Sequence, residues 1–247
     1  MSRICRALIT AGLLLGGVQA SPAQTADEIA EKHLAAIGGR QALAKLTSRT
    51  MTGTITLTSP VGELSGAFEI LNRTPNKMRL AMKIDLTSLG AGTMTFEERF
   101  DGASGYIIDS LQGNRDITGD QLEAMKNAMF PSSFLGYKER GATLELGGRE
   151  KVGERDAYLL TLKSKSGPVE RQYIDAESFL LVRTVVKVNA PPVGEIEQTT
   201  ELLDYQDIDG VKVPFHLKIL SSAQNIDVKV ASVQQNQPVD ESLFSKP

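Results

Sequence analysis

The feature that most constrains this chain is a strict alternation of apolar and polar residues that begins near residue 48 and recurs towards the end. Met51, Gly53, Ile55 and Leu57 alternate with the threonines of the same segment. A period of two is typical of a strand with one apolar and one polar face, as found in antiparallel sheets. The pattern predicts further strands over 63–72, 77–85, 93–100, 105–109, 142–150, 155–164, 180–189, 215–219 and 226–230. Residues 195–205 are polar for a strand, which predicts an exposed or edge strand.

Two helices flank or interrupt the strands. Thr25 with Glu28 three residues later is a capping box, and Gly38-Gly39 ends the helix that it begins. Residues 40–46 continue as a shorter helical piece. The apolar stripe of the first helix consists of Ala26, Ile29, Ala30, His33, Leu34 and Ile37.

The second helix stands alone between two blocks of strands. It begins at Thr118-Gly119-Asp120-Gln121, a capping-box type of start, and Pro131 ends it. Leu122, Met125 and Met129 follow at i, i+3 and i+7, so we expect them to form one stripe that packs on the apolar face of the sheet. Because there is no repeat or long linker, residues 24–247 are predicted to form a single domain.

The first 23 residues are typical of a cleaved signal peptide. Two arginines precede the apolar stretch 7–18, and small residues allow cleavage after Ala20 or Ala23. A retained membrane anchor is the alternative, although the stretch is short for a bilayer span. Cys5, the only cysteine, precedes the apolar stretch, whereas the lipid-modified cysteine of a lipoprotein would follow it. We therefore expect an exported, soluble protein without disulfides.

Composition argues against nucleic acid as a partner. Cleavage would remove Arg3 and Arg6 and leave 25 basic residues of 27 against 30 acidic ones. A mixed, slightly acidic surface has no footprint for phosphates. The chain also has no Trp and only 5% aromatic residues, which weakens the case for stacking platforms that bind bases or sugars.

Side chains for catalysis or metal binding are sparse. Residues 102–105 resemble a serine elbow, but their spacing favours a hairpin turn. His33 and His216 are far apart and are predicted to be structural, with His216 pointing to solvent. No metal-binding motif is present, and the acidic residues Glu195, Glu197 and Glu201 are predicted to form a solvated strand face. We expect no cofactor, no metal and no enzymatic activity.

Glu98 is the carboxylate of most interest, because it shares a strand face with Met94, Phe96 and Phe100. A carboxylate on an apolar face costs free energy unless it is paired or near an opening. Contact with a ligand, rim exposure and pairing with an arginine all remain open for Glu98. Hydrolysis of a glycoside would need a second carboxylate in the same cleft.

The apolar face of so large a sheet has few partners to cover it. A sheet of this many strands must curl, and an incompletely curled sheet leaves a concave apolar groove that helices can cap. Each buried methylene of an acyl chain would contribute about 0.8 kcal/mol, so binding needs no polar anchor. The predicted lining is Ile55, Leu57, Leu80, Met82, Ile84, Met94 and Phe96, and the predicted lid is Leu122, Met125 and Met129. A well-filled core is the alternative for the same residues.

Several segments spread over the mature chain share a further pattern, namely 26–29, 36–39, Leu43, Leu46, 169–175, 209–215 and 236–240. These segments resemble the outer-membrane lipoprotein-sorting family, which is similar to the carrier LolA and the receptor LolB. No local motif around Arg49, Arg73 or Arg79 matches the polar switch residue of the carrier.

This resemblance implies an incomplete barrel of about 11 antiparallel strands with helices over its mouth. It also implies a periplasmic protein that binds lipid or lipoprotein acyl chains, meets envelope transport partners and contacts membranes transiently. We expect a monomer. The alternative is an envelope protein-interaction or sensor module with a packed interior, which would pair through a sheet edge such as 195–205.

Overall fold

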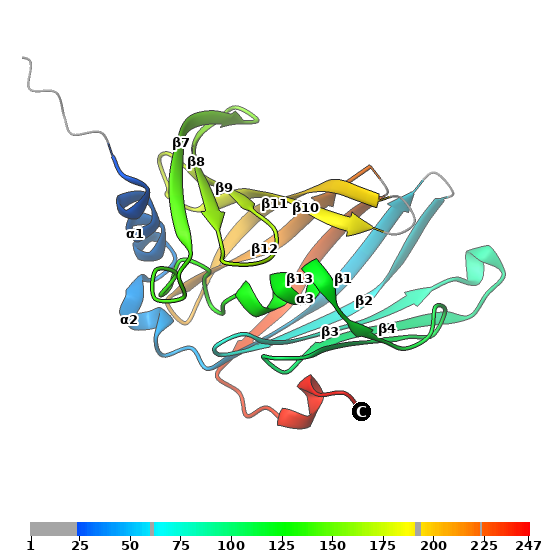
Figure 1. The fold of residues 1–247 in the computed structure, drawn as a ribbon. Helices are drawn as coiled ribbons and strands as arrows, with labels where there is room; N and C mark the ends of the chain where they lie inside the picture. The colour runs from blue at the N-terminus through cyan, green and yellow to red at the C-terminus, as the bar shows by residue number, and fades with distance from the viewer. Residues whose placement is uncertain (1–23, 60–61, 191–193, 223) are drawn as a thin grey trace, which may run out of the picture.

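The computed structural model describes residues 24–59, 62–190, 194–222 and 224–247, so the predicted signal peptide and residues 60–61 of the first predicted turn lie outside it. Within these residues the chain forms one antiparallel sheet of 13 strands in the order β6-β5-β4-β3-β2-β1-β13-β12-β11-β10-β9-β8-β7 (Figure 1). The terminal strands β6 and β7 do not pair, so the barrel stays open. The predicted mainly β fold is confirmed, with 13 strands in place of about 11.

The strands follow the predicted alternation closely, and two were missed. Three-residue β6 is too short to show a period, and β9 has inward Glu170 and Gln172 in place of apolar residues. The bounds are β1 Ser48–Ser59, β2 Gly62–Arg73, β3 Lys77–Asp85, β4 Thr93–Phe100, β5 Gly105–Asp109, β6 Arg115–Ile117, β7 Thr143–Val152, β8 Arg155–Lys163, β9 Glu170–Asp175, β10 Leu181–Ala190, β11 Gly194–Ile208, β12 Val211–Leu220 and β13 Asn225–Gln235.

Of the two alternatives predicted for 195–205, the edge strand is wrong, whereas the partly exposed burial pattern agrees with the exposed strand. Strand β11 lies inside the sheet and pairs with β10 on one side and β12 on the other. Its three glutamates face the convex side, where Glu195 and Glu201 pair with cations of β10 and Glu197 pairs with Arg171 of β9. The polarity of the segment therefore reflects a wet face and not an unpaired edge.

The helices begin largely where the sequence predicted. Helix α1 (Ala26–Ala36) has the capping box of Thr25 and Glu28, and α2 (Gly39–Leu43) follows it. Helix α3 (Gly119–Asn127) begins after Thr118, whose side chain makes no capping hydrogen bond. The chain leaves helical geometry at Ala128, so Met129 lies beyond the helix and not on its stripe. The short 3₁₀ helices are η1 (Thr87–Leu89) and η2 (Glu241–Phe244).

Two apolar clusters divide the concave side of the sheet. In the first, α1 and a loop carrying Phe134 pack on β8 and β9, and we call this region the filled wing. In the second, apolar residues of β1–β4, β12 and β13 meet one another, and we call this region the open wing. Helix α3 lies on the concave side, where Met125 packs against residues of β4–β6 (Figure 1).

Two glycines on the concave face let neighbouring strands of the open wing approach more closely than a side chain would allow. A Cβ on Gly53 would lie 2.0 Å from the carbonyl oxygen of Lys229 and 2.9 Å from the ring of Phe68. A Cβ on Gly66 would lie 2.0 Å from the carbonyl oxygen of Lys83. The β1–β13 ladder also has a bulge next to Gly53, and such bulges increase strand bending.

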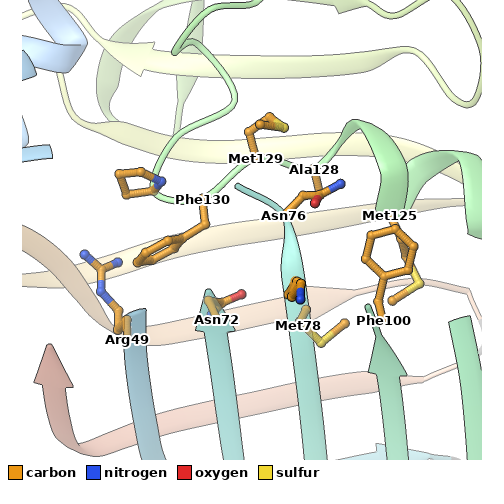
Figure 2. A pocket seen from close by; sticks show the side chains of 11 residues that line it. Arg49, Asn72, Asn76, Met78, Phe100, Met125, Ala128, Met129 and Phe130 are labelled. Carbon is orange, nitrogen blue, oxygen red and sulfur yellow. The ribbon is translucent and has the colours of Figure 1, made fainter. Parts of the chain in front are cut away.

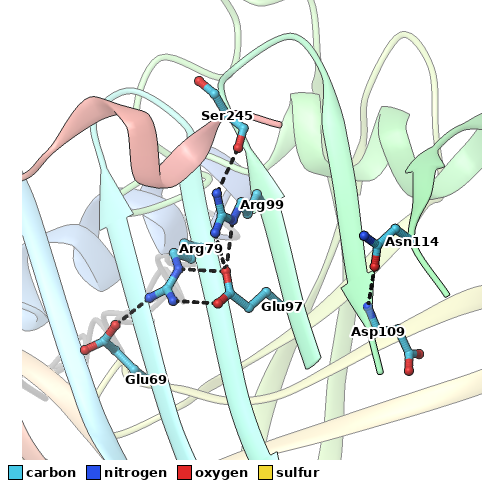
Figure 3. Close-up of polar contacts among 7 residues, drawn as sticks. All are labelled: Glu69, Arg79, Glu97, Arg99, Asp109, Asn114 and Ser245. Carbon is cyan, nitrogen blue, oxygen red and sulfur yellow. Dashed lines mark hydrogen bonds and ion pairs between the residues drawn. The ribbon is translucent and has the colours of Figure 1, made fainter. Parts of the chain in front are cut away.

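The convex face of the same strands is polar and holds the C-terminal strap, residues 241–247. Arg79 bridges Glu69 and Glu97, and Arg99 pairs with Glu97 and donates to the carbonyl oxygen of Ser245 at 3.2 Å (Figure 3). In addition, Glu241 pairs with Arg73 and Lys77, Lys246 pairs with Asp116, and Phe244 is buried. The strap is thus fixed to the outside of the sheet.

Candidate functional site

The seven predicted lining residues all lie on the concave face. The strand registers place Leu80 opposite Glu98, Met82 opposite Phe96, and Ile84 opposite Met94. Ile55 and Ile84 are buried, whereas Leu57, Leu80, Met82, Met94 and Phe96 remain partly exposed. Five of the seven belong to the open-wing cluster, namely Ile55, Leu57, Met82, Ile84 and Met94.

The three predicted lid residues lie on the same concave side but in two different settings. Leu122 and Met125 of α3 pack against Phe100, Ile107 and Ile117, and Met125 is buried. Met129 belongs instead to the segment that follows α3, residues 128–131, which we call the crossing segment.

Two cavities share the crossing segment as a wall. The first cavity has a volume of about 290 Å³ and extends over β1–β4 beneath α3 (Figure 2). The second has about 300 Å³ and extends towards β9–β12. Arg49, Ala128, Met129 and Pro131 line both. Within the described part of the chain, none of the seven predicted lining residues lines either cavity, and the two cavities lie instead on either side of the crossing segment.

The first cavity has one polar and one apolar end. Arg49, Asn72, Met78 and Phe100 are directly opposite one another in successive ladders from β1 to β4. Figure 2 shows Arg49 beside Phe130 at one end and Met78, Phe100 and Met125 at the other. Its remaining walls come from Asn76, Lys77, Ala128, Met129 and Pro131.

Arg49 is the residue that the sequence analysis missed. It is only 9% exposed, and its Nε and Nη2 atoms have no hydrogen-bond partner among the residues that the structure describes. The guanidinium lies over the ring of Phe130, 5.2 Å from its centroid. Burial lowers the pKa of Arg49 to about 10, which leaves it charged at neutral pH. The signal was in the alternation, because Arg49 has the inward parity of Met51 and Ile55.

Two carboxylates also lie on the concave face, one in each wing. Glu98 accepts a hydrogen bond from Nε2 of Gln121 at 3.2 Å, and Glu170 accepts one from Nε2 of Gln172 at 3.1 Å. Burial raises the pKa of both carboxyl groups. Glu170 lines the second cavity and Glu98 lines neither of the two, so neither of these cavities, as formed by the described residues, holds the pair of carboxylates that a glycosidase needs.

The histidines have structural contacts. His33 is buried, its Nδ1 lies 2.9 Å from the carbonyl oxygen of Phe179, and desolvation lowers its pKa. His216 is on the convex face as predicted, where Nε2 contacts Oδ2 of Asp227 at 2.8 Å and leaves the ring half-buried.

The serine-elbow lookalike is a turn, in which Asp101 accepts from the backbone N–H groups of Ala103 and Ser104. Among the described residues, no three His, Cys, Asp or Glu side chains gather to hold a metal. In the same residues, no helix has the length and apolarity of a bilayer span.

Solved structures share this fold over most of their length. A LolA superfamily protein from Nitrosomonas europaea matches with a TM-score of 0.58 and 13% identity, over 91% of this chain and 99% of that one. A DUF1329 family protein from Desulfovibrio piger matches at 0.60 and 10%, over 90% and 98%. A putative outer membrane lipoprotein-sorting protein domain from Vibrio parahaemolyticus matches at 0.57 and 12%, over 88% and 95%.

No family model matches the chain, and no curated protein sequence matches it. The likeness therefore lies in the fold, where it confirms the resemblance inferred from the sequence.

Proposed function

We propose that this chain is a periplasmic carrier that binds lipid or lipoprotein acyl chains on the concave face of its open sheet. The supporting observation is the incomplete cover of that face. Helix α1 and the loop carrying Phe134 bury the filled wing, whereas the open-wing residues Leu57, Met82 and Met94 stay partly exposed. Leu80 and Phe96, on the same concave face, are also partly exposed. Apolar surface that a soluble chain leaves open is typical of a site for an apolar ligand.

The energetics are adequate for a carrier. Burying ten methylenes yields on the order of 8 kcal/mol gross, from about 0.8 kcal/mol each. Lost translational freedom and side-chain ordering offset several kcal/mol of this amount. The remaining few kcal/mol correspond to a Kd on the order of a millimolar for one such chain, so release is rapid, and longer or multiple acyl chains bind more tightly. The signal-like N-terminus and the lipoprotein-sorting description of one structural neighbour support the compartment and the ligand class.

A matched pair of variants on one strand tests the proposal. Leu80→Asp places a charge on the concave face, and Lys83→Asp places one on the exposed convex face. Titration with a dansyl-labelled fatty acid should show at least a tenfold loss of affinity for Leu80→Asp and less than a twofold change for Lys83→Asp. Circular dichroism checks folding, and native mass spectrometry of the wild type identifies retained lipid. A folded Leu80→Asp with wild-type affinity would contradict the proposal, as would a wild type that binds no acyl probe.

One observation favours a second function, a protein-interaction module. Strand β7 has ten residues and pairs only with β8, so one edge of the sheet is available for an added strand. This edge replaces 195–205, which lies inside the sheet. Cross-linking of envelope extracts to the chain, lost on Glu145→Pro in β7 with acyl binding retained, would support this function.

A further inference from the structure

The guanidinium of Arg49 gives the first cavity a positive charge and N–H donors, which the binding of an acyl chain alone does not need. A buried polar group without a partner costs free energy, and a buried charge costs more. Nε and Nη2 of Arg49 are such groups among the described residues, and the nearby Phe130 ring, 5.2 Å from Cζ to the centroid, offers them no oxygen or nitrogen acceptor. The donors are therefore free to bind an acceptor that enters the cavity.

The other charges around the cavity favour an anion. Lys77 is the second charged lining residue, and its Nζ already pairs with Glu241 at 2.5 Å. No carboxylate lines the first cavity, whereas Glu170 lines the second. An oxyanion would thus meet Arg49 without repulsion on the side of β1–β4, and a guanidinium can bind it with two hydrogen bonds.

The row that begins at Arg49 continues as a path for a hydrocarbon chain. Asn72, Met78 and Phe100 follow it on β2, β3 and β4. Three strand spacings span about 14 Å. A carbon chain advances about 1.3 Å per bond, so a ten-carbon chain lies along most of this row. Met125 and Met129 cover it from above, and methionine adapts to variable chains (Figure 2).

We propose that the first cavity binds an anionic amphiphile, with its carboxylate or phosphate on Arg49 and its chain over Met78 and Phe100. The inference rests on the proposed function and narrows its ligand class. A free fatty acid or a lipid phosphate carries the required charge, whereas an acyl chain on a neutral glyceride or amide does not. The site therefore distinguishes ligands with an anionic headgroup from neutral ones, whereas the rest of the concave face recognises only the hydrocarbon chain.

Isothermal titration calorimetry at pH 7.5 with decanoate, decyl phosphate, 1-decanol, acetate and inorganic phosphate tests the proposal. Hydrogen bonds to charged groups predict that decanoate binds about tenfold to hundredfold more tightly than decanol. Decyl phosphate should show the same preference, and its ratio to decanoate tells which oxyanion fits better. Acetate and inorganic phosphate should bind at least tenfold more weakly than their decyl counterparts.

Two substitutions locate the effect. Arg49→Met should abolish the preference for decanoate while the decanol affinity stays within threefold. Lys77→Gln removes the other lining cation and should change the decanoate affinity less than threefold. If Arg49→Met does not fold, Arg49→Lys keeps the charge but loses the two-pronged geometry, and it should lower the preference several-fold.

The outcomes separate this inference from the proposed function. Equal binding of decanoate and decanol by the wild type overturns the headgroup site and leaves acyl carriage intact. Binding of neither overturns both. Equal losses of decanoate affinity in Arg49→Met and Lys77→Gln assign the effect to general charge and overturn the site, and so does acetate binding as tightly as decanoate.

Discussion

The filled wing and the open wing are built from strands of the same alternating pattern, yet their concave faces differ in what covers them. In the filled wing, Ile29 and Leu34 of α1 and Phe134 of the loop between α3 and β7 bury Leu160 and Ile174 completely. In the open wing, the cluster around Ile55 and Ile84 is made by the sheet itself, and residues at its border stay partly exposed. The covered half forms a buried core, and the uncovered half carries the acyl site that we propose.

Two phenylalanines give the largest expected contrast. Phe134 is 2% exposed in the filled wing, so Phe134→Ala should lower the free energy of unfolding by about 3–5 kcal/mol. Phe96 is half-buried in the open wing, and Phe96→Ala should cost about 1–2 kcal/mol because less surface is withdrawn from water. Urea unfolding measures both, and titration with a labelled fatty acid should show the larger affinity loss for Phe96→Ala. The reverse order of stabilities would break the comparison.

The cap of α1 gives a smaller effect on the filled wing alone. Thr25→Ala removes the hydroxyl that accepts from the backbone N–H of Glu28. Loss of such a cap costs about 1 kcal/mol of stability. Acyl affinity should not change, since α1 does not contribute to the open wing. Chemical denaturation together with the same titration checks this, and a parallel loss of affinity would show that the two wings are coupled.

His33 makes the stability of the filled wing depend on pH. Its pKa is lowered from 6.5 by burial, so the fold favours the neutral ring. The contribution is complete above pH 6.5 and is lost as pH falls towards the folded-state pKa. Urea midpoints measured at falling pH should therefore decline in the wild type and decline less steeply in His33→Gln. An identical slope in both proteins would refute this role for His33.

Glu98 makes the open wing respond in the opposite direction. Burial raises its pKa above 4.5, so the folded state favours the protonated acid and the cost of the carboxylate is complete above the folded pKa. Glu98→Gln should therefore stabilise the protein at pH 8, and the advantage should vanish below pH 4.5. Thermal melts across this range measure it. A substitution that destabilises at pH 8 would show that Glu98 has a stabilising partner in solution.

The sequence predicted those features of the two wings that depend on contacts between residues close in the chain. Alternation along one strand placed Leu80, Met82 and Ile84 on one face, and the Thr25–Glu28 spacing predicted the start of α1. Which face α1 covers depends on strands more than a hundred residues away, which no local pattern encodes. Arg49 was missed for the same reason. Its side chain is buried by Phe130 and the rest of the crossing segment, which lie far from it in the sequence.

The C-terminal strap has a practical consequence for handling the molecule. Ion pairs of Glu241 and Lys246 and the buried ring of Phe244 fasten the last residues to the outer wall, on the reverse of the surface that faces α3 (Figure 3). A biotin or affinity tag added after Pro247 would leave from that outer wall. A protein immobilised in this way would present its hollow to the liquid, and captured lipid could be exchanged and weighed on a sensor chip without detaching the protein.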